Sequence, residues 1–90
     1  MNRITKHNLE AVVARINRVM GTPERPYLNG EPQALCYHLD GAYSGYALHQ
    51  MCKTGSGIHD VFGGHMPMRE LYNRMHAFLI GVAAVDRDKS

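Results

Sequence analysis

Two stretches with the apolar spacing of an amphipathic helix, one near each end of the chain, constrain the fold most strongly. Their apolar residues recur every three or four positions, which places them along one side of a helix. The first stripe comprises Leu9, Val12, Val13, Ile16 and Met20, and the second comprises Met68, Leu71, Tyr72, Met75, Phe78, Leu79 and Val82. The two stripes predict helices over residues 6–20 and 67–84.

Residues that favour helix ends lie at the boundaries of both predicted helices. Thr5 is a suitable N-cap, and Gly21 followed by Thr22-Pro23 is a suitable stop. Pro67 suits the first position of the second helix, because the N–H that proline lacks has no intrahelical partner there. The first helix is expected to expose the long polar side chains outside its stripe, namely Arg15, Asn17 and Arg18.

Between the helices the chain is too rich in glycine for a third long helix. Six of the nine glycines fall within one stretch of 24 residues, and each weakens a helix by about 1 kcal/mol relative to alanine. Apolar and polar residues alternate over 35–39, 46–48 and 58–62, as in half-buried strands. For the middle segment, a short helix over Ala47–Lys53 that ends at Gly55 is the alternative.

The order helix, three strands, helix predicts an α+β domain of two layers, with both helices on one face of a three-stranded antiparallel sheet. Ninety residues allow one modest core. We therefore expect residues 1–90 to form a single domain, with residues 1–4 and 86–90 frayed.

The polar start of the chain and its two cysteines predict a cytoplasmic protein. Residues 1–10 lack the apolar core of a signal peptide, and no apolar run approaches the roughly 20 residues of a membrane span. A secreted domain of this size usually carries four or more cysteines, so Cys36 and Cys52 are expected to be free thiols. A single disulfide between neighbouring strands is the alternative.

Signals for catalysis and for metal binding are weak. His49 and Cys52 have a spacing that two metal ligands can use, but no second close pair completes a tetrahedral set. The chain has no nucleophile elbow and no spacing typical of paired catalytic carboxylates. Residues 54–57 lack the lysine of a phosphate-binding loop. We expect a protein that is not an enzyme and that has no metal or cofactor.

Aromatic, histidine and glycine residues indicate a binding surface instead. Aromatic rings beside glycines can stack on a base or dock a partner, and a glycine pair leading into a helix with a nearby arginine suits an anion. The predicted ligand-binding residues are Tyr43, Tyr46, His49, His65 and Arg69. The alternative is that Tyr37 and Tyr46 fill the core and that the histidines are scattered over the surface.

Charge is unevenly distributed along the chain. Residues 1–26 carry five basic and two acidic residues, a net +3, whereas residues 27–65 carry one basic and three acidic residues, a net −2. The basic outer face of the first helix could meet nucleic acid or an acidic protein, although a solvated helix face is the simpler interpretation. A total of +2 excludes a nucleic-acid coat protein driven by charge.

Three segments carry a resemblance to known sequences: Leu9–Arg18 (LEAVVARINR), Tyr37–Met51 (YHLDGAYSGYALHQM) and Arg69–Gly81 (RELYNRMHAFLIG). In these segments the chain resembles a family of small uncharacterised proteins of tailed bacteriophages and prophages of proteobacteria. The family offers no catalytic residue to transfer. The resemblance implies an accessory protein that acts by binding in the host cell.

Two functions follow from this setting, and the sequence does not separate them. One is counter-defence, in which the protein sequesters a nucleotide immune signal. The alternative is a protein–protein inhibitor of a host or bacterial defence protein, and a nucleic-acid-binding regulator is a further alternative. A homo-oligomer is expected, because a monomer of 90 residues has little room for a deep pocket.

Overall fold

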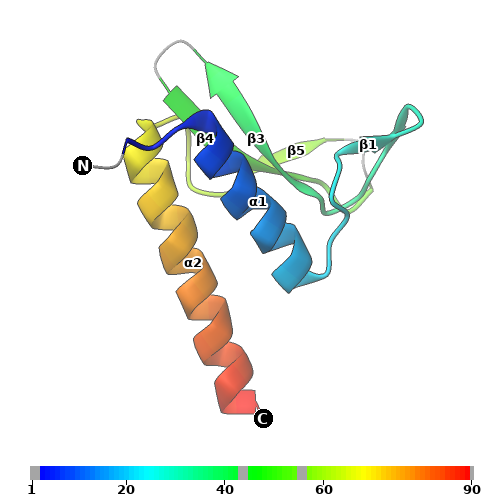
Figure 1. Cartoon of the computed structure of the whole chain (residues 1–90). Helices are drawn as coiled ribbons and strands as arrows, with labels where there is room; N and C mark the ends of the chain where they lie inside the picture. The colour runs from blue at the N-terminus through cyan, green and yellow to red at the C-terminus, as the bar shows by residue number, and fades with distance from the viewer. Residues whose placement is uncertain (1–2, 43–44, 55–56, 90) are drawn as a thin grey trace.

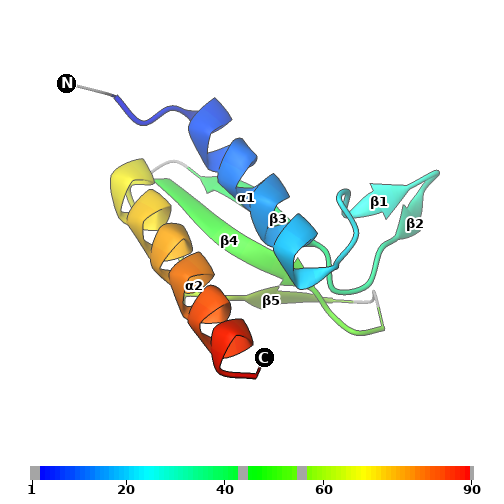
Figure 2. The same ribbon diagram turned by 60° about the horizontal axis from the view of Figure 1, so that its bottom comes forward.

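Two helices lie side by side on one face of a three-stranded antiparallel sheet, and a two-stranded hairpin projects beside them (Figures 1 and 2). The computed structural model describes residues 3–42, 45–54 and 57–89, with side chains as far as Val85 in the last helix. The predicted α+β class and the order of the main elements are confirmed. The elements are α1 (Lys6–Met20), β1 (Tyr27–Leu28), β2 (Glu31–Pro32), β3 (Tyr37–Ala42), β4 (Gly45–Met51), β5 (Ile58–Asp60) and α2 (Met68–Lys89).

Helix α1 begins and ends where the sequence predicts. The Thr5 hydroxyl accepts the Asn8 N–H at 3.2 Å, and the Asn8 side chain accepts the Thr5 N–H at 2.9 Å, so both residues satisfy donors that the helix leaves free. Gly21 ends the helix in the left-handed conformation, with φ 71°, which glycine adopts without steric penalty.

Helix α2 is longer than the sequence predicts. Pro67 precedes the helix instead of starting it, and the helix continues to Lys89, five residues beyond the expected end at 84. Gly81 therefore does not terminate the helix, because Ala83 and Ala84 follow it and alanine is the strongest helix former. The backbone of residues 86–89, which the sequence analysis places in a frayed tail, is helical.

The sheet has the strand order β3-β4-β5, and both pairings are antiparallel. The middle segment pairs on both sides as β4, so the alternative of a helix over Ala47–Lys53 is wrong. In the register of the sheet, His38 lies opposite His49, and His49 lies opposite Asp60. The third strand ends at Asp60, two residues earlier than expected.

The hairpin β1–β2 was not expected as a pair of strands. Its turn is the Asn29-Gly30 dipeptide, in which both residues have positive φ, 53° and 80°. That combination is typical of the tight turn that joins two short antiparallel strands.

The core lies between the two helices and the sheet. Both predicted stripes contribute to it, and its buried members are Leu9, Val12, Val13, Ile16, Tyr37, Leu48, Met66, Leu71, Met75 and Leu79. Ile4 also packs against this core, although the sequence places it in a frayed segment. Cys36 is buried, Cys52 is half-buried, and both are free thiols.

Asn17 is the one buried polar residue among those described, at 1% exposure, and its expected position on the exposed side of α1 is wrong. Its side-chain NH₂ donates to the Tyr37 carbonyl at 2.9 Å, and its side-chain oxygen accepts the Tyr37 N–H at 2.8 Å. The Thr22 hydroxyl donates to the same oxygen at 2.8 Å. The amide thus joins α1 to the first residue of β3.

These bonds complete an edge of the sheet. The Cys36 carbonyl accepts the Met51 N–H of β4, so the next residue, Tyr37, directs its own N–H and carbonyl away from β4. Strand β3 is at the edge of the sheet, where such groups lack a strand partner. The Asn17 amide supplies both missing hydrogen bonds.

Over residues 3–42, 45–54 and 57–89, no helix is long and apolar enough to cross a bilayer.

Replacing Asn17 with alanine is expected to lower the free energy of unfolding by roughly 2–4 kcal/mol, because the buried N–H and carbonyl of Tyr37 both lose their partner. Urea denaturation measures this change. Asn73→Ala is the matched control, since Asn73 is exposed on α2 and should change stability by no more than about 0.5 kcal/mol. Equal effects of the two substitutions would contradict the role given to Asn17.

Candidate functional site

The face of the sheet that the helices leave open carries a group of histidine and aspartate side chains. Side chains alternate between the two faces along a strand. Tyr37 and Leu48 face the helices and belong to the core, so His38, Asp40 and His49 project from the opposite face. The titratable side chains of β3 and β4 thus lie on the face away from the helices.

The strand register brings two of these histidines and an aspartate together. The rings of His38 and His49 meet edge to face, with their centroids 5.7 Å apart. On the other side of His49, its Nε2 lies 3.9 Å from the Asp60 carboxylate. Each residue comes from a different strand, so the contacts depend on the pairing of β3, β4 and β5.

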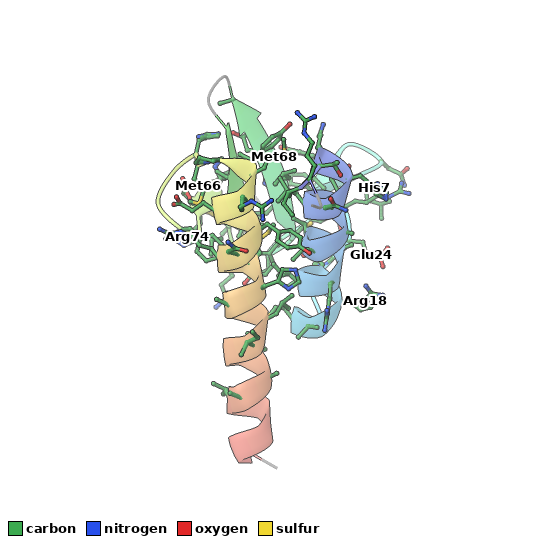
Figure 3. All side chains as sticks on the ribbon, turned by 60° about the vertical axis from the view of Figure 1, so that its left-hand side comes forward. His7, Arg18, Glu24, Met66, Met68 and Arg74 are labelled. Atoms are coloured by element: carbon green, nitrogen blue, oxygen red, sulfur yellow. The ribbon has the colours of Figure 1, made fainter. Side chains whose placement is uncertain are left out.

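The loop over residues 61–66 is fixed to β4 at both of its ends. The Val61 N–H donates to the Leu48 carbonyl at 3.0 Å. Tyr46 and Met66 exchange two backbone hydrogen bonds of 2.9 Å, just before the loop enters α2 (Figure 3). Gly45 permits this closure, since a Cβ at that position would lie 2.1 Å from the Met66 carbonyl oxygen.

The loop adds a third histidine to the group. The Nε2 atom of His65 lies 2.7 Å from an Asp40 carboxylate oxygen. Because a carboxylate only accepts hydrogen bonds, Nε2 is the donor of this bond. The His65 ring also lies 6.0 Å from the His49 ring. We call the five residues the histidine–aspartate cluster: His38, Asp40, His49, Asp60 and His65.

Burial disfavours the charged form of His38. Desolvation lowers the pKa of His38, and the neighbouring His49 lowers it further, while Asp40 opposes this shift. The Nε2 atom of His38 and the Nδ1 atom of His49 are buried and have no hydrogen-bond partner among the described residues. The cluster therefore contains two imidazole nitrogens whose hydrogen-bonding capacity is unused.

Asp60 is held in its charged form. Burial acts to raise its pKa, but the backbone N–H groups of Gly64, Gly63 and Phe62 together with His49 outweigh this effect and lower the pKa. The bond from the Gly63 N–H to the carboxylate measures 3.0 Å. The glycines before α2 thus bind a carboxylate of this chain, whereas the sequence assigned them to an external anion.

The cluster offers acceptors at a surface that a ligand can reach. The side chains of Asp40 and Asp60 are 45% and 36% exposed, and that of His65 is 30% exposed. The five residues include no lysine or arginine, so the carboxylates are the permanent charges among them. Within the described part of the chain, no three His, Cys, Asp or Glu residues are placed to hold a metal ion. The arrangement suits a ligand with a positive charge and N–H donors.

The structure brings together two of the five predicted site residues, His49 and His65. Tyr46 lies on the helix side of the sheet, where its ring covers Gly41 and packs against the core. This placement agrees with the alternative in which Tyr37 and Tyr46 fill the core. Arg69 lies exposed in the first turn of α2, and Tyr43 is outside the described residues.

Sequence reasoning missed His38, Asp40 and Asp60 as parts of the site. The alternation of a strand already places His38 and Asp40 on one face, and it places Tyr46 and His49 on opposite faces because their separation is odd. The missing information was the register, which sets which residues of neighbouring strands lie side by side.

We expect His38 to make the folded protein less stable as the pH falls. The folded chain holds His38 below its ordinary pKa of 6.5, so the unfolded chain takes up the proton first as the pH falls below about 6.5. Stability is therefore lost on acidification. In urea denaturation at about pH 7.5 and about pH 5, His38→Gln should lose less stability than the wild type.

His7→Gln is the control for this comparison, because His7 is exposed on α1. It should leave the loss of stability between the two pH values unchanged. An unchanged loss in His38→Gln would contradict the assignment.

In comparisons with known proteins, no family model, no curated protein and no solved structure matches this chain. Function must therefore be inferred from the residues and their geometry.

Proposed function

We propose that this protein acts by binding another protein, and that the histidine–aspartate cluster recognises a basic segment of that partner. One observation carries the proposal: two reachable carboxylates, those of Asp40 and Asp60, lie on one face of the sheet. Arginine and lysine are donors only, so they complement such a set of acceptors.

The charges of the cluster favour a cation. Asp60 keeps its charge because backbone N–H groups stabilise the carboxylate. Asp40 is fixed by His65 with one oxygen at 2.7 Å, and its side chain is nearly half exposed. An arginine that reaches either carboxylate forms charge-assisted hydrogen bonds, which are about twice as strong as neutral ones.

A nucleotide has less support as the ligand. Its phosphates would approach Asp40 and Asp60, and like charges about 4 Å apart repel by roughly 1–4 kcal/mol near a protein surface. Tyr46, which was expected to stack on the base, lies against the core on the other face of the sheet. Sequestration of a nucleotide signal therefore ranks behind protein binding.

The resemblance to phage and prophage proteins suggests the class of partner. In that setting the protein would inhibit a host enzyme or a bacterial defence protein by covering a basic region of its surface. Electrostatic attraction of this kind speeds encounter and selects the partner, which suits a small inhibitor.

The proposal predicts that the wild type binds a fluorescent arginine-rich peptide at low ionic strength, measured by fluorescence anisotropy. Asp40→Asn and Asp60→Asn should each weaken binding about tenfold, because a hydrogen bond to a charged group contributes roughly 1.5–3 kcal/mol. Both substitutions keep a side-chain oxygen, so the bonds from His65 and Gly63 retain an acceptor.

Glu70→Gln is the control, since this carboxylate pairs with Arg74 on the exposed side of α2 at 3.2 Å. It should leave the affinity for the peptide unchanged. Equal affinity in all four proteins would exclude the cluster as the peptide site. Binding of cyclic nucleotides in place of the peptide would favour sequestration instead.

A further inference from the structure

The outer edge of β3 carries backbone groups that no described strand pairs with. In the sheet, β3 pairs with β4 only, so its other side is an edge. The backbone groups of successive residues in such a strand point alternately to its two sides. The N–H and carbonyl of Tyr37 point away from β4, to the Asn17 side chain. Those of Leu39 and Gly41 therefore point the same way, beyond the reach of Asn17.

This edge is open to an added strand. Proteins commonly protect an edge strand with a proline or a lysine, and the sequence of β3, YHLDGA, contains neither. Gly41 is exposed, and the far end of β3 projects beyond both helices (Figure 1). Strand β3 has six residues, whereas β5, at the other edge, has three. The β3 edge is thus the longer template for an extended peptide.

A hollow beside this edge leaves room for side chains of such a strand. It has a volume of about 280 Å³ and lies between α1 and β3, and its lining residues include Glu10, Val13, Ala14 and Leu39. A strand added to β3 would direct every second side chain to this helix side of the sheet. Two glutamates, Glu10 and Glu24, line the hollow, and no lysine or arginine does. The hollow therefore suits a segment that carries basic residues.

The other side chains of an added strand would face Asp40. In an antiparallel pairing, two residues of the segment bond to Leu39 and Gly41, and the residue between them lies directly opposite Asp40. This position is on the face that carries the histidine–aspartate cluster, where the Asp40 side chain is 45% exposed. Opposite charges across a strand pair stabilise it. The residue opposite Asp40 is therefore expected to be arginine or lysine.

The same register disfavours a second copy of this chain as the added strand. When two copies of β3 pair antiparallel through their free groups, Leu39 of each copy lies opposite Gly41 of the other. Asp40, the residue between them, then lies directly opposite Asp40 of the second copy. Like charges in this position destabilise a strand pair. A foreign segment with a basic residue at this position avoids the repulsion.

We propose that the basic segment of the partner binds as an extended strand along the outer edge of β3, with main-chain hydrogen bonds to Leu39 and Gly41 and a basic side chain opposite Asp40. This mode of binding rests on the proposed function, because it describes how the same basic segment lies on the protein. Main-chain bonds provide affinity, and alternate side chains provide specificity. Unlike a contact made by side chains alone, it requires backbone N–H groups of the segment.

Peptides methylated on selected backbone nitrogens test the proposal with the full chain, by fluorescence anisotropy at low ionic strength. The probe is a fluorescent peptide of about seven residues in which valine and arginine alternate, so that it favours an extended strand. With arginine opposite Asp40, the valine N–H groups donate to β3 and the arginine N–H groups point to solvent. Methylation of the valine nitrogens removes these donors and should weaken binding about tenfold or more. Methylation of the arginine nitrogens is the matched control and should leave the affinity unchanged.

Hydrogen exchange of the protein gives a second readout. At saturation with the unmethylated peptide, the amides of Leu39 and Gly41 should exchange about tenfold more slowly, because they gain hydrogen-bond partners. The amide of Ile58 is the internal control. It points to the outer edge of β5 and should exchange at an unchanged rate.

Equal affinity for all three peptides would overturn the added strand and keep the cluster as a site for side chains only. Loss of affinity on methylation of the arginine nitrogens would overturn the register with arginine opposite Asp40. Failure of every peptide to bind would contradict the proposed function itself, and the added strand with it. Slower exchange of Leu39 and Gly41 at higher protein concentration without peptide would assign the edge to a second copy and likewise overturn the proposal.

Discussion

The paired hydrogen bonds between the Asn17 side chain and the backbone of Tyr37 determine how the layers of this protein fit together. Tyr37 begins an edge strand, and without Asn17 its N–H and carbonyl would be buried and unpaired. With these bonds in place, α1 is fixed against β3, and α2 packs beside it on the same face of the sheet. Both surfaces discussed above depend on this arrangement. The helices cover one face only, which leaves the histidine–aspartate cluster open on the other, and Asn17 bonds to Tyr37 alone, which leaves the rest of the β3 edge without a strand partner.

The helices were predictable because each has a continuous apolar stripe and a recognisable boundary, such as Thr5 before α1 and Gly21 after it. Asn17 was not predictable, because an asparagine in a helix appears polar and exposed unless the position of the edge strand is known. The length of α2 was underestimated for a related reason. The penalty at Gly81 is local, whereas the alanines after it and the continuing stripe to Val85 act over several turns.

The site was only partly predictable. His49 and His65, which the sequence analysis names as ligand-binding residues, lie close together, with their rings 6.0 Å apart. Strand alternation alone would have excluded Tyr46 from the same face and added His38. Asp60 required the register of β4 against β5, which a single sequence does not specify when the strands are short and rich in glycine. The two carboxylates that this register brings in are the reason we propose a cation in place of a phosphate as the ligand.

We propose above all that the histidine–aspartate cluster is where a basic partner binds. Titration of the ¹⁵N-labelled protein with an arginine-rich peptide, followed by amide chemical shifts, tests it residue by residue. We expect the largest shift changes on the cluster residues and on Gly63 and Gly64, whose backbone N–H groups bond to Asp60. Changes confined to the exposed side of α1 or to the last turns of α2, with the cluster unaffected, would contradict it.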